Sequence, residues 1–221
     1  MDSATRRVYC AGPLFNAKER EEMAELAEAL EGAGLKTFLP QRDGLEFTVC
    51  VPALVDKGIP HKTAANLVAK AIFAVDVYQV LRGCDAIVVN LNGRVPDEGA
   101  VSEAAIAWCG GKVVVGYKAD ERSVFLGQDN PLVAGLFVFG ISTSIQEAVQ
   151  QVKRSLASHP SPSEMKQTRR EQIEAYLNLG ERLWKAMKGE NKVENVANLL
   201  CADSGVETVS RATRECDAPR A

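Results

Sequence analysis

The clearest candidates for chemistry are the acidic residues of the segment Cys84–Trp108. The run Ala86–Leu91 lacks alternating polarity, which is typical of a parallel strand covered on both faces. Asp97 and Glu98 follow it, and ligands of open α/β sheets bind at the carboxyl ends of strands. Glu103 lies about one turn into the next predicted helix, where backbone N–H groups favour a negative charge by roughly 0.3 to 1 kcal/mol. We therefore expect Glu103 to be ionised and available. Alternatively, Asp97 and Glu98 only cap the helix and Glu103 is a solvated charge.

Two more carboxylates, those of Asp43 and Asp76, could lie at the same edge of the predicted sheet. Asp43 follows a predicted strand in PQRDG, and Asp76 lies in AIFAVDVYQVL, where position alone favours the exposed helix face. The sequence has no metal-ligand histidine pattern, glycine-rich phosphate loop or Ser/Cys–His pair, so no metal or cofactor is expected. Paired carboxylates without a metal indicate cleavage at an acetal-like carbon, where one carboxylate attacks and another acid assists the leaving group.

Strands that alternate with helices must position these acids, and that alternation predicts an α/β fold with a parallel sheet. Asn16 and Glu19 resemble a capping box at the start of the first helix. Pro52, Gly58 and Pro60 predict an irregular excursion over Leu45–Lys62 that is suited to covering a pocket. The predicted strands are Arg7–Ala11, Leu35–Leu39, Ala86–Leu91, Lys112–Tyr117 and Leu136–Ile141, and the predicted helices include Ala17–Ala33, Ala64–Leu81 and Thr143–Leu156.

A length of 221 residues predicts one hydrophobic core with a smaller additional segment. We assign residues 1–157 to the domain that holds the sheet. The stretch SHPSPS, residues 158–163, is a linker by composition. Residues 164–221 then form a helical carboxyl-terminal extension of unknown role, with a charged helix over Glu164–Lys188 and a polar tail from Gly189.

Composition argues against several partners. The net charge of −3 provides no basic stripe for a nucleic acid polymer, and no apolar run approaches the roughly 20 residues that span a membrane. The amino-terminal residues lack the apolar stretch and cleavage site of a secretory signal, which predicts a cytoplasmic location. The six cysteines show no CxxC spacing and are interpreted as reduced thiols, and neither His61 nor His159 is assigned a catalytic role.

Four motifs resemble those of the nucleoside 2-deoxyribosyltransferase family. They are VYCAGPLFN at Val8–Asn16, FLPQRDG at Phe38–Gly44, CDAIVVNLNG at Cys84–Gly93 and DEGAVSEAAIAW at Asp97–Trp108. The most specific of them has an aspartate, then glycine, and a glutamate six residues after the aspartate. The similarity covers about Arg6–Leu156. Together with the alternation of strands and helices, it implies a flavodoxin-like (Rossmann-like) five-stranded parallel sheet with helices on both faces.

The resemblance implies a role for each matching residue. Glu103 corresponds to the nucleophile that forms a covalent 2-deoxyribosyl intermediate at C1′, and Tyr9 to the tyrosine that orients it. Asp97 corresponds to the acid that helps to protonate the departing base, and Asp76 falls near the second aspartate with that task. Substrate-binding positions correspond to Ala11, Gly12, Phe15, which would pack against the nucleoside, Asp43, which would hold the base, and Gly99. Glu98 is left as a structural residue.

The resemblance also implies a homo-oligomer, a dimer or larger, because family members complete each pocket with an asparagine from a neighbouring subunit. That residue corresponds to Asn130 in DNPLVAG, where it would bind the sugar 5′-hydroxyl. Leu132 stands where a methionine usually follows. Compact members of the family lack the extension after Ser158, so the similarity does not explain it.

Three functions compete. The first is transfer of 2-deoxyribose between bases, with 2′-deoxyribonucleosides and free nucleobases as substrates. The second keeps the nucleophile but lets water accept the sugar, which gives a nucleoside or nucleotide N-glycosidase; the loop AGPLFN has no Ser or Arg to hold a phosphate, which disfavours a nucleotide. The third is a non-catalytic nucleotide-sensing module, and the combination of Tyr9, Asp97 and Glu103 argues against it.

Overall fold

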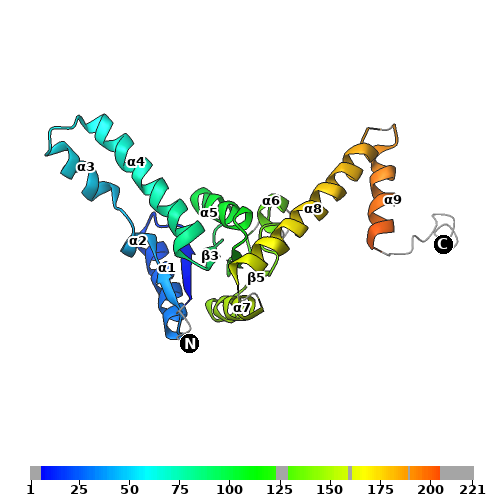
Figure 1. The fold of residues 1–221 in the computed structure, drawn as a ribbon, viewed down its shortest axis with the longest axis horizontal. Coiled ribbons are helices and arrows are strands. Elements are labelled where there is room, and N and C mark those ends of the chain that lie inside the picture. Colours follow the sequence, from blue (N-terminus) through cyan, green and yellow to red (C-terminus); the bar gives the residue numbers. More distant parts are fainter. Residues whose placement is uncertain (1–5, 123–128, 159–160, 189, 205–221) are drawn as a thin grey trace, which may run out of the picture. The chain divides into compact units, whose positions relative to one another are not determined.

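A five-stranded, all-parallel sheet forms the centre of the fold (Figure 1). The computed structural model describes residues 6–122, 129–158, 161–188 and 190–204. The strand order β2-β1-β3-β4-β5 is the order of flavodoxin-like sheets, as the sequence predicts. The strands are β1 (Arg7–Ala11), β2 (Lys36–Phe38), β3 (Ala86–Asn90), β4 (Val113–Tyr117) and β5 (Ile141–Ser142).

Helices cover both faces of the sheet. On one face lie α1 (Ala17–Gly32) and α7 (Ile145–Ser158), and on the other lie α5 (Glu98–Cys109) and the π-helical turn η1 (Gln79–Gly83) that ends α4 (His61–Tyr78). The remaining helices are α2 (Pro40–Asp43), α3 (Phe47–Val55), α6 (Pro131–Ala134), α8 (Pro162–Ala186) and α9 (Lys192–Ser204).

Alternation along β1 decides which side chains reach the site. Val8 and Cys10 enter the core beneath α1 and α7, whereas Tyr9 and Ala11 enter the core beneath α5. Successive side chains of a strand point to opposite faces, so both cores are built from the same strands. Tyr9 is fully buried at a central strand and therefore has a fixed position beneath the start of α5.

The first helix begins as the sequence predicts. The Asn16 side chain accepts from the Glu19 N–H at 3.0 Å, and the Glu19 carboxylate accepts from the Asn16 N–H at 3.3 Å, which completes a capping box. This cap fixes the end of the loop that runs from β1 into α1. The loop, residues 12–16, is one wall of the candidate site.

Two predicted irregular segments are helical. PQRDG contains the short helix α2, which begins at Pro40, a favoured first helical residue. The predicted excursion over Leu45–Lys62 contains α3, although Pro52 lies inside this helix. Val51 of α3 packs with Ala64 and Val68 of α4, so tertiary packing outweighs the low helix propensity of proline here.

The carboxyl-terminal half also differs from the predictions. The fifth strand spans only Ile141–Ser142, because the chain turns after α6 and Phe137 is buried in a turn rather than in a strand. Helix α8 begins at Pro162, inside the predicted linker. Helix α9 lies in the segment that the sequence left as a polar tail.

The chain divides into two compact units between Arg169 and Arg170, so the first unit includes the first two turns of α8. Met165 and Arg169 of these turns are buried, and the Arg169 guanidinium lies 4.7 Å from the centre of the Trp108 ring. The second unit contains the rest of α8 and α9, which are joined by an ion pair between Arg182 and Asp203 at 2.6 Å.

One described helix is apolar enough to cross a membrane by length and composition alone, which the sequence analysis did not anticipate. It spans His61–Gly83, with a mean hydropathy of 1.4. The same helix packs against α3 and α5 and contributes to the candidate site, so its apolar character has a role within the fold.

Candidate functional site

A cleft of about 780 Å³ lies at the carboxyl edge of the sheet, where the sequence predicts it. Its walls come from the loop after β1, the segment from α2 to the start of α3, one face of α4 and the first turns of α5. The order of the strands reverses between β1 and β3, and this switch point is where open α/β sheets bind ligands. The carboxylates that line the cleft are Glu46, Asp76, Asp97, Glu98 and Glu103.

Tyr9 and Glu103 form the central contact of the cleft. The Tyr9 hydroxyl donates to Glu103 Oε1 at 2.6 Å, a short charge-assisted bond between a strand and a helix that are 94 residues apart. The Tyr9 ring stacks on Phe38 with 5.3 Å between ring centres. Burial raises the pKa of Tyr9 well above its usual value, and the negative charge of Glu103 raises it further, so the hydroxyl keeps its proton and acts as a donor.

Burial raises the pKa of Glu103 to about 7, and the charges of Asp76 and Asp97 raise it as well, while the hydrogen bond from Tyr9 lowers it. Helix α5 begins at Glu98, so Glu103 lies beyond the first turn, where the stabilisation by the helix dipole has decayed. The surroundings of Glu103 therefore favour its neutral form more than a position in the first turn of a helix would.

Asp97 and Asp76 lie near Glu103 from two different elements. Asp97 caps α5, because its Oδ2 accepts from the Ala100 N–H at 2.7 Å, and it also lines the cleft. Asp76 belongs to α4, and burial raises its pKa, with a partly opposing effect from the Tyr9 hydroxyl. Asp76 thus faces the cleft rather than the exposed helix face, because α4 packs beside α5.

The glycine-containing loop after β1 forms one wall, as the sequence predicts. Gly12 lies in such close packing that a Cβ atom would clash with Met23 and approach the Asn90 Cβ to 2.8 Å. Phe15 lines the cleft with 80% of its surface exposed, and Gly99 lines it from the first turn of α5. Ala11 is buried at the end of β1, directly before Gly12.

Besides the buried Ala11, three predicted binding residues do not line the cleft in the described part of the chain: Asp43, Asn130 and Leu132. The Asp43 carboxylate accepts from the Leu39 N–H at 2.9 Å and from Arg42. Burial acts to raise its pKa, but these hydrogen bonds outweigh that effect and lower it. Asn130 caps α6 by accepting from the Leu132 N–H at 2.9 Å, and the Leu132 side chain is 85% exposed.

The sequence analysis missed four polar residues of the cleft, Arg20, Gln41, Glu46 and Thr48. The Gln41 amide donates to the Arg20 carbonyl oxygen at 2.8 Å, while its own Oε1 is buried and has no hydrogen-bond partner among the described residues. Arg20 donates to the Leu14 carbonyl oxygen at 3.0 Å and provides the positive charge among the residues that line the cleft. None of the four carries a local signal in the sequence.

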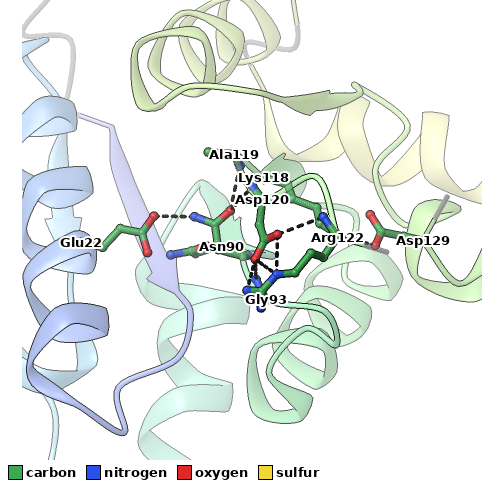
Figure 2. Close-up of polar contacts among 9 residues, drawn as sticks. Glu22, Asn90, Gly93, Lys118, Ala119, Asp120, Arg122 and Asp129 are labelled. Carbon is green, nitrogen blue, oxygen red and sulfur yellow. Dashed lines mark hydrogen bonds and ion pairs between the residues drawn. The ribbon is translucent and has the colours of Figure 1, made fainter. Parts of the chain in front are cut away.

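A second polar group ties together the loops that follow β3 and β4 (Figure 2). Asn92 Oδ1 accepts from the N–H groups of Ala119 and Asp120 at 2.7 and 3.0 Å, and its Nδ2 donates to Glu22 of α1. The Gly93 N–H donates to Asp120 at 3.1 Å. These bonds fix the start of the loop that leads to Asp97, on the side of the sheet that α1 covers.

The arrangement suits acid–base and nucleophilic chemistry at a carbon atom. Three carboxyl groups with different environments converge on one cleft, and two of them have raised pKa values. Within the described residues, no group of three His, Cys, Asp or Glu side chains is arranged to hold a metal ion. The four cysteines of the first unit, Cys10, Cys50, Cys84 and Cys109, are free thiols, while Cys216 lies outside the described residues.

The sequence profile of the nucleoside 2-deoxyribosyltransferase family matches residues 8–179, so this chain belongs to that family of pentosyl transferases. Membership in this family implies nucleoside and nucleobase substrates. The matched range, residues 8–179, includes every candidate residue of the cleft. No curated protein matches the sequence significantly.

One solved structure with a TM-score above 0.5 shows the same fold. A conserved protein from Enterococcus faecalis is 22% identical, with a TM-score of 0.53, over 69% of this chain and 100% of that one. A 2-deoxyribosyltransferase from Bacillus psychrosaccharolyticus is 14% identical, with a TM-score of 0.46 over 64% and 88% of the two chains. A 2-desoxiribosyltransferase from Leishmania mexicana is 16% identical, with a TM-score of 0.42, and the match covers 70% of this chain and 98% of that one.

Proposed function

We propose that this protein transfers 2-deoxyribose between nucleobases through a covalent intermediate on Glu103, as a step of nucleoside salvage. The observation that carries the proposal is the short hydrogen bond from Tyr9 to Glu103 in a cleft that Asp76 and Asp97 also line. Tyr9 fixes one carboxylate oxygen and leaves the other free to reach the substrate. Burial raises the pKa of Asp76, which suits a carboxyl group that exchanges a proton with the substrate.

The proposed reaction consists of two displacements at C1′. Glu103 attacks C1′ as the bond from C1′ to the base nitrogen breaks, and the departing base takes the bonding electrons and a proton from Asp97 or Asp76. A nitrogen of the second base then attacks C1′, gives its proton to the carboxylate of Asp97 or Asp76 that protonated the first base, and releases the Glu103 carboxylate. Each step inverts the anomeric carbon, so the configuration is retained overall.

The charge of the cleft supports a nucleoside rather than a nucleotide substrate. Five carboxylates and one guanidinium, that of Arg20, line it. A 5′-phosphate would meet this net negative field, and like charges close together are unfavourable. Gln41 and Phe15 are suited to the base and the nucleoside ring system, since a buried amide oxygen without a partner accepts N–H donors and an exposed aromatic ring offers stacking area.

We further propose that Asn130 and Leu132 act in the cleft of a neighbouring subunit of a homo-oligomer. Both residues are exposed and neither lines the cleft of its own chain. Exposed apolar residues on α3 and α4, among them Phe47, Leu67 and Phe73, offer additional contact area. A cytoplasmic location remains a prediction.

The decisive experiment incubates the protein with 2′-deoxyinosine and adenine and follows deoxyadenosine, hypoxanthine and free deoxyribose by chromatography. Glu103→Ala should abolish deoxyadenosine formation. The matched control is Glu98→Ala, which removes a carboxylate from the same helix and the same cleft but not the partner of Tyr9, and should retain most activity. Free sugar without a new nucleoside would identify a hydrolase, and binding without turnover would identify a sensing module.

The shared site has a separate test. Glu103→Ala and Asn130→Ala subunits, each inactive in isolation, should regain activity when they are mixed and allowed to reassemble, because a hybrid contains one intact composite cleft. A monomer in solution, or no recovery after confirmed subunit exchange, would contradict the role of Asn130 across an interface.

A further inference from the structure

A second hollow lies at the opposite edge of the sheet from the cleft. Three of the residues that line it directly precede strands: Arg6 precedes β1, Asp85 precedes β3 and Lys112 precedes β4. Arg82 of η1, Lys166 of α8 and Ser161 complete its polar lining. The volume is about 180 Å³, and every lining residue belongs to the unit that ends at Arg169. We call it the amino-edge hollow.

Positive charge dominates this hollow. Four cationic side chains line it against the single carboxylate of Asp85. That carboxylate is already engaged, because Oδ1 accepts from the Arg6 guanidinium at 2.9 Å and Oδ2 accepts from the Arg7 N–H at 2.9 Å. In the described part of the chain, neither Arg82 nor Lys166 forms an ion pair. The hollow therefore has an uncompensated positive charge in a protein whose net charge is −3.

Lys112 is held inside this positive region. Its ammonium donates to the Cys84 carbonyl oxygen at 2.6 Å, which fixes the side chain beneath the strand edge. Burial lowers the pKa of Lys112, the nearby Asp85 carboxylate partly opposes this, and the charges of Lys166 and Arg82 lower it further, so both cations repel the Lys112 ammonium. A bound anion would attract each of these cations and so offset the repulsion between them. The cations are brought together by the fold, since they come from three separate elements.

Gly111 explains how α8 approaches so closely. Its φ of +69° is in the left-handed region that favours glycine, and a Cβ atom there would lie 2.9 Å from the Lys166 Cα. Glycine thus allows α8 to bring Lys166 beside Lys112. Apolar atoms complete the wall, from Leu81, Val113, Leu156 and Met165.

The size and the donors define the ligand. A volume of about 180 Å³ equals roughly six water molecules, which suits one tetrahedral oxyanion but not a whole nucleotide. Guanidinium and ammonium groups are the usual partners of phosphate oxygens. We propose that the amino-edge hollow binds a phosphate group through Arg6, Arg82, Lys112 and Lys166, either as orthophosphate or as the phosphate of a small phosphomonoester.

The test compares the full-length protein in sodium phosphate and in sodium chloride at equal ionic strength. Phosphate should raise the Tm in a concentration-dependent manner, because a ligand of the folded state stabilises it. The variant Arg82→Ala/Lys166→Ala should bind phosphate at least tenfold more weakly by calorimetric titration. Both side chains are exposed, so the fold should persist. The matched control is Lys57→Ala/Lys70→Ala, which removes the same charge from exposed positions elsewhere and should bind as the wild type does.

Equal Tm values in the two salts, or an unchanged Kd in Arg82→Ala/Lys166→Ala, would overturn the proposal. Binding that disappears in Glu103→Ala but persists in Arg82→Ala/Lys166→Ala would also overturn it, because the phosphate would then occupy the cleft. Titration with methyl phosphate distinguishes the two sources: tighter binding than orthophosphate supports a phosphomonoester, and weaker binding supports orthophosphate. None of these readouts depends on transferase activity.

Discussion

The hydrogen bond from the Tyr9 hydroxyl and the buried, acidic surroundings of Glu103 have opposite effects on the pKa of the Glu103 carboxyl group. Burial and two neighbouring acids favour the neutral form of Glu103, while the Tyr9 donor favours the charged form. The balance leaves the pKa at about 7, where a change in one hydrogen bond alters the ionised fraction strongly. Tyr9 therefore has two roles in the proposed reaction, since it both orients the carboxylate and sets its charge.

Tyr9→Phe should lower kcat about 10- to 100-fold and shift the acidic limb of the pH profile of kcat/KM upward from about 7, because the lost hydrogen bond no longer lowers the pKa of Glu103. The stack on Phe38 is retained, so the fold should persist. Tyr117→Phe is the control, since its hydroxyl donates to Glu22 at 3.2 Å in the other core. An identical pH midpoint in Tyr9→Phe and the wild type would contradict this role.

Glu103 should also destabilise the folded protein at alkaline pH. Its pKa is raised from 4.5 to about 7, so the folded state holds the proton more tightly than the unfolded state. The contribution of Glu103 to stability is therefore fully present below pH 4.5 and is lost as the pH rises to about 7. Glu103→Gln removes that loss. Its Tm should exceed that of the wild type by about 2–6 °C at pH 8 and should equal it at about pH 4, as measured by calorimetry. Equal Tm values of Glu103→Gln and the wild type at pH 8 would show that ionisation of Glu103 does not destabilise the folded protein.

At the scale of elements, short loops tied to one another hold the acids in place. Asp97 caps α5, and the loop that leads to it begins at Asn92 and Gly93, which bond to residues after β4 (Figure 2). The same asparagine bonds to Glu22 of α1. One side chain thus connects two sheet-edge loops and a helix, and this polar network adds to the apolar packing of α5 on the sheet.

Asn92→Ala should lower the free energy of unfolding by about 2 to 4 kcal/mol, because it removes three hydrogen bonds of about 0.5–1.5 kcal/mol each and leaves backbone N–H groups without a partner. Urea unfolding followed by circular dichroism measures this loss. Arg122→Ala provides the comparison within the same network, since its ion pair with Asp120 is open to solvent and should contribute less to stability than the Asn92 side chain does. Losses of equal size in the two variants would contradict a central role for Asn92.

Local signals explain which elements the sequence predicts well. The strand at Arg7–Ala11 and the capping box at Asn16 depend on neighbouring residues, and the structure confirms both. Helix α3 was missed because its stability comes from packing on α4, which overrides Pro52. The fifth strand was predicted too long because an apolar run such as Leu136–Ile141 fits a buried turn as well as a buried strand.

At the scale of the whole molecule, the candidate site gathers residues from distant parts of the sequence. The family motifs predict Tyr9, Asp97 and Glu103 in the cleft, and the structure places all three there or directly beneath it. Gln41 and Arg20 carry no local signal, since their contribution depends on how α1 and α2 meet. The burial of Asp76 likewise depends on α4 packing beside α5, which periodicity along one helix does not contain.

The boundary between the two units also depends on contacts that composition does not encode, and truncation tests it. A chain that ends at Arg169 should keep a Tm within about 2 °C of the full-length protein, because the first unit is complete there.

A chain that ends at Ala157 loses the buried Met165 and the Arg169 side chain that covers Trp108. Its free energy of unfolding should fall by about 2 to 5 kcal/mol, from about 1.5–3 kcal/mol for the methionine and 0.5–2 kcal/mol for the cation–π contact. Urea titration of both chains, followed by Trp108 fluorescence, measures the difference. Equal stability would place the boundary at the predicted linker and would make the first turns of α8 dispensable to the unit that holds the cleft.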